Sequence, residues 1–149
     1  MTNRDLWTCP KCGNRFVTAN MWHSCGTFDI DELFANSDPN VRKAFDALAE
    51  MVQTLAEVTV IPQKTRIAFQ TRTRFAGGTP KRKTFDASFI FFERKEHQRF
   101  YKIMDYSGKW FGHHVLLRGP EDVDDSVLAW LKEALRYGNQ EDRQKKNVE

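Results

Sequence analysis

Two stretches of the chain carry apolar residues at helical spacing. In the first, Ser37-Asp38-Pro39 combines a capping residue with a proline near the first helical position, which is typical of a helix start. We predict a helix from there to about Glu57, because one apolar stripe recurs at spacings of three and four residues. The stripe consists of Val41, Phe45, Leu48, Val52 and Leu55. One or two helical turns are also expected over residues 29–35.

The second helical stretch lies near the C-terminal end. Acidic residues within 122–125 supply capping side chains for a helix start. The apolar stripe that follows consists of Val127, Leu128, Leu131 and Leu135. Gly138 stands where a helix stop is expected. Residues 139–149 are polar and are expected to form a disordered tail.

Between these helices the hydrophobic period changes to two residues, which indicates β-strands. We predict one strand from Lys64 to Ala76, a glycine-rich turn over 76–80, and further strands over 85–93, 99–105 and 110–117. About five consecutive strands joined by short turns favour an antiparallel sheet. With one helix before the sheet and one after it, the predicted class is α+β.

Composition limits the organisation of the chain. Its 149 residues, 40% of them hydrophobic, suffice for one domain of ordinary size with a small appendage. Phenylalanine is frequent, with 12 residues, so an aromatic core is expected. No apolar run approaches the roughly 20 residues of a membrane helix, and no signal segment begins the sequence. We therefore expect a cytoplasmic protein.

The three cysteines all lie within the first 25 residues, and an odd number does not suit a disulfide framework. Cys9 and Cys12 form a C-x2-C turn, and ten residues separate it from His23 and Cys25. Three sulfurs and one imidazole fill a tetrahedral zinc shell with no open position, which indicates a structural ion. We predict a zinc-knuckle-like segment over residues 1–28 that folds on metal binding. A redox C-x-x-C and an incidental grouping are the alternatives.

Charge is unevenly distributed. Residues 64–118 contain 13 basic and 4 acidic residues, although the net charge of the whole chain is only +3. Such a basic segment is typical of proteins that bind polyanions, and arginine grips phosphate through two hydrogen bonds. A solvated sheet face and a protein-binding surface are the alternatives. We expect Arg66, Arg72 and Arg74 to share one face of the predicted strand, and the candidate contacts on this strand and the following turn are Arg66, Arg72, Arg74, Lys81, Arg82 and Lys83. Further contacts to bases or sugars are possible for Gln70, Tyr101, Trp110 and His114, if they share that face.

Catalytic motifs are weak. Asp86, Glu93 and Lys95 resemble the acidic pair and lysine of metal-dependent nucleases, but odd and even strand positions put the two carboxylates on opposite faces. Neighbours His113 and His114 also face opposite ways, and a half-buried structural role is expected for His114. No nucleophile elbow, phosphate loop or dinucleotide fingerprint is present. We therefore expect a protein that is not an enzyme.

Four segments together resemble a known family. They are residues 6–13, 22–26 and 64–69, and Asp124-Asp125 leading into Trp130-Leu131. In these the chain is similar to a bacterial family called domain of unknown function 5655, in a form with an N-terminal zinc-knuckle-like extension. The resemblance implies a compact α+β domain over residues 29–138. In some bacterial proteins related domains are fused to nuclease-like modules, so the resemblance favours a nucleic-acid context, although the family has no established activity.

Taken together, these patterns predict a zinc-binding protein that binds DNA, RNA or another polyanion through a basic strand and turn. Two alternatives stay open. One is a protein-interaction module that uses the zinc segment, with Trp7 and Trp22 as anchors. The other is a small-molecule or enzymatic pocket in the aromatic sheet.

Overall fold

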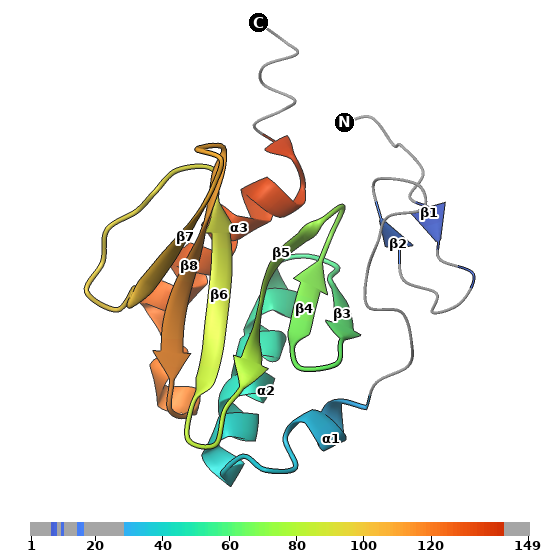
Figure 1. Cartoon of the computed structure of the whole chain (residues 1–149), viewed down its shortest axis with the longest axis vertical. Coiled ribbons are helices and arrows are strands. Elements are labelled where there is room, and N and C mark those ends of the chain that lie inside the picture. Colours follow the sequence, from blue (N-terminus) through green and yellow to red (C-terminus); the bar gives the residue numbers. More distant parts are fainter. Residues whose placement is uncertain (1–6, 9, 11–14, 17–28, 142–149) are drawn as a thin grey trace, which may run out of the picture.

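The computed structural model describes residues 7–8, 10, 15–16 and 29–141. Two short strands come first, and the remaining elements form one α+β unit (Figure 1). The elements are β1 (Trp7–Thr8), β2 (Arg15–Phe16), α1 (Ile30–Leu33), α2 (Pro39–Leu55), β3 (Thr59–Pro62), β4 (Ile67–Gln70), β5 (Arg74–Pro80), β6 (Phe85–Phe91), β7 (Lys102–Tyr106), β8 (Trp110–Leu117), the 3-10 turn η1 (Pro120–Asp122) and α3 (Asp125–Gly138).

The main sheet is antiparallel throughout, as predicted. Its six strands follow the order β3-β4-β5-β6-β8-β7, so β6 lies inside the sheet while β3 and β7 form its edges. The sequence had suggested about five strands. β1 and β2 pair separately as a small antiparallel sheet. The α+β class with helices at both ends of the domain is therefore confirmed.

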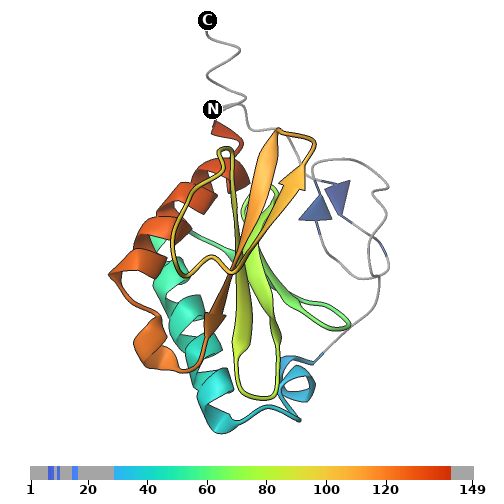
Figure 2. The ribbon, with the colours of Figure 1, turned by 60° about the vertical axis from the view of Figure 1, so that its left-hand side comes forward.

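Helices α2 and α3 cover one face of the main sheet, and β1 and β2 lie on the other side (Figure 2). The predicted stripe of α2 faces the sheet, with four of its members buried and Leu55 half-buried. The Phe45 ring stacks on Phe69 with 6.1 Å between centroids and lies 5.6 Å from Phe85. Burial of each such ring contributes on the order of 2–3 kcal/mol. The expected aromatic core therefore lies between the helices and the sheet.

The prediction of one strand from 64 to 76 is wrong. The segment forms β4 and β5, and Thr71–Thr73 make the turn between them. The alternation of threonine and arginine continues through this turn, so the sequence pattern does not mark it. The turn packs against the end of α3, where the Gly138 carbonyl accepts hydrogen bonds from the backbone N–H groups of Arg72 (3.2 Å) and Thr73 (3.1 Å).

The predicted turn at residues 76–80 is also wrong, because these residues lie inside β5. The glycines serve close packing. A Cβ atom on Gly78 would lie 2.5 Å from the Phe85 ring, and one on Gly77 would lie 2.2 Å from the Ile67 carbonyl oxygen. Gly77 also has a φ of 154°, which side-chain-bearing residues rarely adopt. Two glycines can therefore indicate a crowded strand as well as a turn.

The helix ends combine confirmed and corrected details. Asp124 caps α3 as predicted, since its carboxylate accepts a hydrogen bond from the Val127 N–H at 3.3 Å. Asp38 occupies the cap position of α2 without a side-chain hydrogen bond. Gly138 is the last residue of α3, and its Cβ would lie 2.6 Å from the Phe75 ring. Gly138 therefore permits close packing of the helix end on β5.

The expected strands over 85–93 and 99–105 are shifted at their ends, to Phe85–Phe91 and Lys102–Tyr106, whereas Trp110–Leu117 agrees with its prediction. In the described part of the chain, no helix has both the length and the apolar character needed to cross a membrane.

Candidate functional site

The face of the main sheet opposite α2 and α3, here called the outer face, carries most of the candidate binding residues. Direct cross-strand partners share a face of a sheet. Ser88 of β6 is opposite Gly77 on one side and His114 on the other, and His114 is opposite Lys102. These residues alternate with buried apolar residues such as Phe89, which faces the helices. The outer face is therefore polar at its centre.

Two tight turns lie at the same end of this sheet. One joins β3 to β4, closed by a 2.7 Å hydrogen bond from the Gln63 N–H to the Arg66 carbonyl. The other joins β5 to β6, closed by a 2.8 Å bond from the Lys81 N–H to the Thr84 carbonyl. Ile67 pairs with Gly78, so both turns lie at the same sheet end (Figure 1). This basic end carries five exposed side chains: Lys64, Arg66, Lys81, Arg82 and Lys83.

The β5–β6 turn is held by the segment that precedes α2. The Asp38 N–H donates to the Arg82 carbonyl at 2.7 Å, and the Ser37 hydroxyl donates to the Lys81 carbonyl at 2.7 Å. Both contacts use backbone atoms of the turn. Its three basic side chains are exposed, while the main chain that carries them is fixed.

The expectation that Arg66, Arg72 and Arg74 share one strand face is wrong. Arg66 precedes β4 at the basic end, whereas Arg72 lies in the turn at the opposite end of the sheet. The Arg72 Nε donates to the Gln140 Oε1 at 3.1 Å, so this side chain packs along the end of α3. Arg74 begins β5 opposite Gln70, and its Nε and Nη2 atoms are buried. Arg74, unlike Arg72, borders the same cavity as Arg66.

This cavity has a volume of about 310 Å³ and opens on the outer face over β4, β5 and β6. Its polar lining comes from Arg66, Arg74, Ser88 and the β3–β4 turn, and Ala68 and Ile90 provide apolar walls. The volume is at the lower limit of small-molecule sites, which span roughly 300–1,000 Å³. Two of the predicted arginines, Arg66 and Arg74, therefore line the same cavity as Ser88, which was not among the residues predicted from the sequence.

Arg66 is exposed as a whole residue, yet its guanidinium turns inward toward the sheet. Its Nη2 lies 3.4 Å from the Ser88 Oγ and donates a hydrogen bond to it. Burial of this guanidinium lowers the pKa of Arg66, although the charges of Tyr106 and Asp86 act in the opposite direction. The charged end of Arg66 is therefore buried although the residue as a whole is exposed.

Asp86 forms a second polar group beside the cavity. Its carboxylate accepts a 2.6 Å hydrogen bond from the Tyr101 hydroxyl and lies 3.3 Å from the His114 Nδ1. Partial burial by itself would raise the pKa of Asp86, but the hydrogen bonds from His114 and Tyr101 outweigh it and lower that pKa. Burial and the bond to Asp86 raise the pKa of Tyr101 to about 12. Asp86 is thus held as an ionised acceptor.

Exposed rings lie on the same face, on β7 and β8. Tyr106 is opposite Trp110, and Tyr101 immediately precedes β7. Tyr101 is 51% exposed and Tyr106 43% exposed, and Gly112 leaves room for the Tyr106 ring. Of the residues predicted to assist, His114 therefore lies on the outer face together with Tyr101, whereas the Trp110 ring packs 5.6 Å from the Tyr137 ring of α3. Gln70 also faces outward but is buried, and its Nε2 donates a hydrogen bond to the Arg15 carbonyl of β2.

His113 has a structural role. It is fully buried on the helix side of β8, and its Nε2 accepts a 2.9 Å hydrogen bond from the Lys95 N–H. Its Nδ1 lies 3.0 Å from the Phe111 carbonyl. Burial lowers the pKa of His113, which favours the neutral ring that these two contacts require. The two adjacent histidines thus face opposite sides of the sheet, as predicted.

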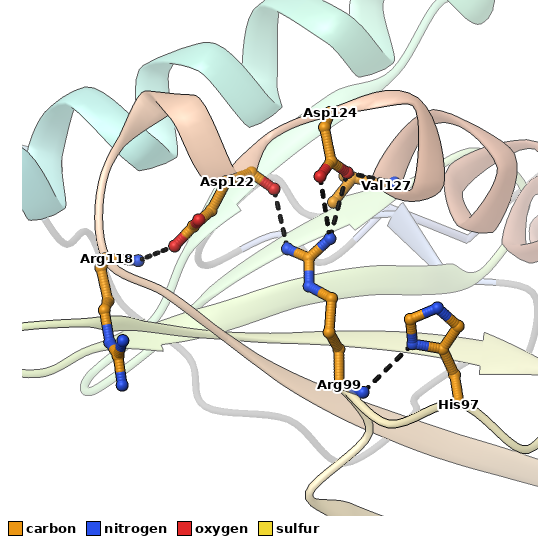
Figure 3. Close-up of polar contacts among 6 residues, drawn as sticks. All are labelled: His97, Arg99, Arg118, Asp122, Asp124 and Val127. Carbon is orange, nitrogen blue, oxygen red and sulfur yellow. Dashed lines mark hydrogen bonds and ion pairs between the residues drawn. The ribbon is translucent and has the colours of Figure 1, made fainter.

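A separate cluster ties the β6–β7 loop to the start of α3 (Figure 3). The Arg99 Nη1 lies 3.1 Å from both carboxylate oxygens of Asp124, and its Nη2 donates to the Asp122 carbonyl at 2.8 Å. The Arg99 N–H donates to His97 Nδ1, and the guanidinium lies 5.2 Å from the Trp130 ring centre. Burial opposes ionisation of Asp124, but the Val127 N–H and Arg99 lower its pKa. These contacts hold a loop in place.

The four predicted zinc ligands, Cys9, Cys12, His23 and Cys25, lie outside the described residues. β1 and β2 are described and pair antiparallel with each other. In the sequence, β1 precedes and β2 follows the segment that contains Cys9 and Cys12. Across the described ranges, no group of three or more histidine, cysteine or acidic side chains is placed to hold a metal ion. The expected tail over 139–149 is described only as far as Glu141.

The fold and the outer face define an α+β domain whose helices cover one side of an antiparallel sheet and leave a polar face on the other. The family described as domain of unknown function (DUF5655) matches residues 30–137, and the chain belongs to this family. Comparison with curated proteins and with solved structures gave no match.

Proposed function

We propose that this protein binds nucleic acid, with single strands preferred, across the outer face of its sheet. The observation that carries the proposal is the basic end, where two turns at the same end of the sheet present four exposed cationic side chains, Lys64, Lys81, Arg82 and Lys83, beside Arg66 with its inward guanidinium. Phosphate neutralisation by lysine and arginine supplies most of the affinity of such surfaces. The β5–β6 turn is anchored through its backbone, so little chain ordering would oppose binding.

Single strands are preferred because exposed tyrosine rings lie on the outer face, which also carries Arg66 and Arg74. Single-stranded nucleic acids bind where a basic groove follows the backbone and aromatic rings stack on the bases, at roughly 1–3 kcal/mol per base. Tyr101 and Tyr106 offer such rings along β7, beside the half-buried Trp110. A paired duplex would keep its bases stacked on each other and would make no use of these rings.

The proposal includes one structural zinc ion bound by Cys9, Cys12, His23 and Cys25. It is supported by the ligand types and their spacing, and by the β1–β2 pairing that brackets the first two cysteines in sequence. The Arg15 carbonyl of β2 accepts a hydrogen bond from Gln70, so β2 lies against the outer face. The ion would then stabilise a segment that borders the nucleic-acid surface.

Fluorescence anisotropy tests the proposal. Zinc-loaded protein is titrated into labelled random single-stranded DNA, single-stranded RNA and duplex DNA at several salt concentrations. We expect binding that weakens steeply with salt and is tighter for single strands than for the duplex. Absence of binding to any of the three at low salt would mean that the basic end is only a solvated surface.

A further inference from the structure

The outer-face cavity is lined by donors of positive or neutral character. Arg66, Arg74 and Lys64 contribute cationic groups, and Ser88 contributes a hydroxyl. None of the described lining residues is acidic. Asp86, which lies two residues before Ser88 on the same face of β6, is already engaged by Tyr101 and His114. The chemistry of the walls therefore favours an anion.

The contact between Arg66 and Ser88 orients donors into this space. Because the Ser88 Oγ accepts a hydrogen bond from Arg66, its own proton remains available for a ligand. The guanidinium of Arg66 is partly desolvated, which is unfavourable for a charge unless an opposite charge lies nearby. An anion in the cavity would supply that charge and accept from both the guanidinium and the hydroxyl.

The donor count distinguishes among anions. A carboxylate offers two oxygens and one charge, whereas a phosphate monoester offers three terminal oxygens and a charge of about −1.5 to −2. The guanidinium groups of Arg66 and Arg74, the Lys64 ammonium group and the Ser88 hydroxyl line the cavity together, and their combined positive charge suits the larger and more highly charged set. Ala68 and Ile90 form an apolar wall on which the organic part of an ester would pack.

We infer that this cavity binds a phosphate monoester. Two sources share this chemistry: a small phosphorylated molecule, and the terminal phosphate of a strand that lies on the basic end. The second source rests on the proposed function, whereas the first does not. The experiment below separates the two.

The first arm uses small probes and the unaltered zinc-loaded protein. Phenyl phosphate, benzoate and phenol are each added while amide signals are followed by nuclear magnetic resonance. We expect phenyl phosphate to shift the signals of Arg66, Ser88 and Ile90, with benzoate much weaker and phenol inactive. Equal effects of benzoate and phenyl phosphate, or no response at these residues, would overturn the inference.

Variants then assign the contacts. Arg66→Gln and Ser88→Ala each remove one donor, and loss of a hydrogen bond to a charged group should weaken phenyl phosphate binding roughly 10- to 100-fold. Ser126→Ala, on α3 away from the cavity, is the matched control and should bind normally. Circular dichroism verifies folding. Unchanged binding in both cavity variants would show that the probe binds elsewhere.

The second arm compares one oligonucleotide with a terminal phosphate and with a terminal hydroxyl. Tighter binding of the phosphorylated form, lost in Ser88→Ala, would identify the strand end as the ligand. Equal binding of the two forms, with phenyl phosphate still bound, would identify a small phosphorylated molecule instead. Oligonucleotide binding without any phenyl phosphate binding would overturn the cavity inference and leave the proposed function standing. Phenyl phosphate binding without oligonucleotide binding would do the reverse.

Discussion

Replacement of Lys81, Arg82 and Lys83 by glutamine removes three charges from the basic end with little expected effect on folding. All three side chains are exposed. The hydrogen bonds that fix the turn, including those from Ser37 and Asp38, use backbone atoms of the turn and remain possible in the variant. A change in nucleic-acid binding would therefore reflect the lost charges.

The expected change in the salt dependence of binding follows from counterion release. If each of the five basic side chains of this end neutralises one phosphate of a single strand, the logarithm of affinity should fall with the logarithm of salt at a slope of about −3.5. The triple variant retains two of them, Lys64 and Arg66, so its slope should be about −1.4. Between 50 and 200 mM salt, the wild type should then lose roughly 130-fold in affinity and the variant about 7-fold.

The assay is fluorescence anisotropy with a labelled single strand over that salt range. A matched control replaces Lys43, Arg94 and Lys132 by glutamine, which lowers the net charge equally at exposed positions on α2, the β6–β7 loop and α3. The control should keep a slope near the wild-type value. A turn variant that retains the wild-type slope, or a control that falls just as far, would refute the assignment of the phosphate contacts to this end.

Three further predictions concern stability, ionisation and metal. Gly138→Ala should lower the free energy of unfolding by about 1–3 kcal/mol in urea denaturation, because the added Cβ would meet the Phe75 ring. This loss should outweigh the better helix propensity of alanine, and a stabilised variant would contradict the packing. In an ultraviolet-monitored titration, Tyr101 should ionise near pH 12, so its neutral form persists below that pH, and Asp86→Asn should move the transition down toward the ordinary value of 10.0. Metal analysis should find one zinc per wild-type chain and far less in Cys12→Ser, whereas a zinc-poor wild type after metal-replete expression would exclude the four-ligand site.

The helices were predictable because their signals are local. The stripe of α2 repeats over several turns, so Val41, Phe45 and Leu48 identify the buried face without knowledge of the sheet. The cap at Asp124 is equally local, since donor and acceptor are three residues apart. Tertiary contacts do not compete with either signal here, so prediction and structure agree.

The strand boundaries were not predictable from alternation alone. Period two marks strands, but the Thr71–Thr73 turn continues the same alternation, so β4 and β5 merge in the sequence. Gly77 and Gly78 fit a turn by composition, yet they lie in β5 because the Phe85 ring and the β4 backbone need the space. The reason for each glycine lies in its contact with an adjacent strand, which composition alone does not reveal.

The candidate site was predictable in its residue types more than in its arrangement. The basic character of the segment indicated Arg66 and residues 81–83, and these do lie at one end of the sheet. The separation of Arg72 and the inclusion of Ser88 depend on the register between β4, β5 and β6. The even positions of β6 were visible as polar alternation, but their cross-strand partners were not.

The strand order has a consequence for how the domain folds. From β3 to β6 each strand pairs with its sequence neighbour, so this meander can form through successive hairpins of low contact order. Pairing of β8 with β6 must instead close the chain over residues 92–109, an entropic step whose magnitude grows slowly with loop length. The arginine-lined cavity belongs to the local meander, whereas the contact between Asp86 and His114 forms only after that closure. During synthesis, the arginine-bearing half of the outer face would therefore be assembled while its tyrosine-bearing half is still unpaired.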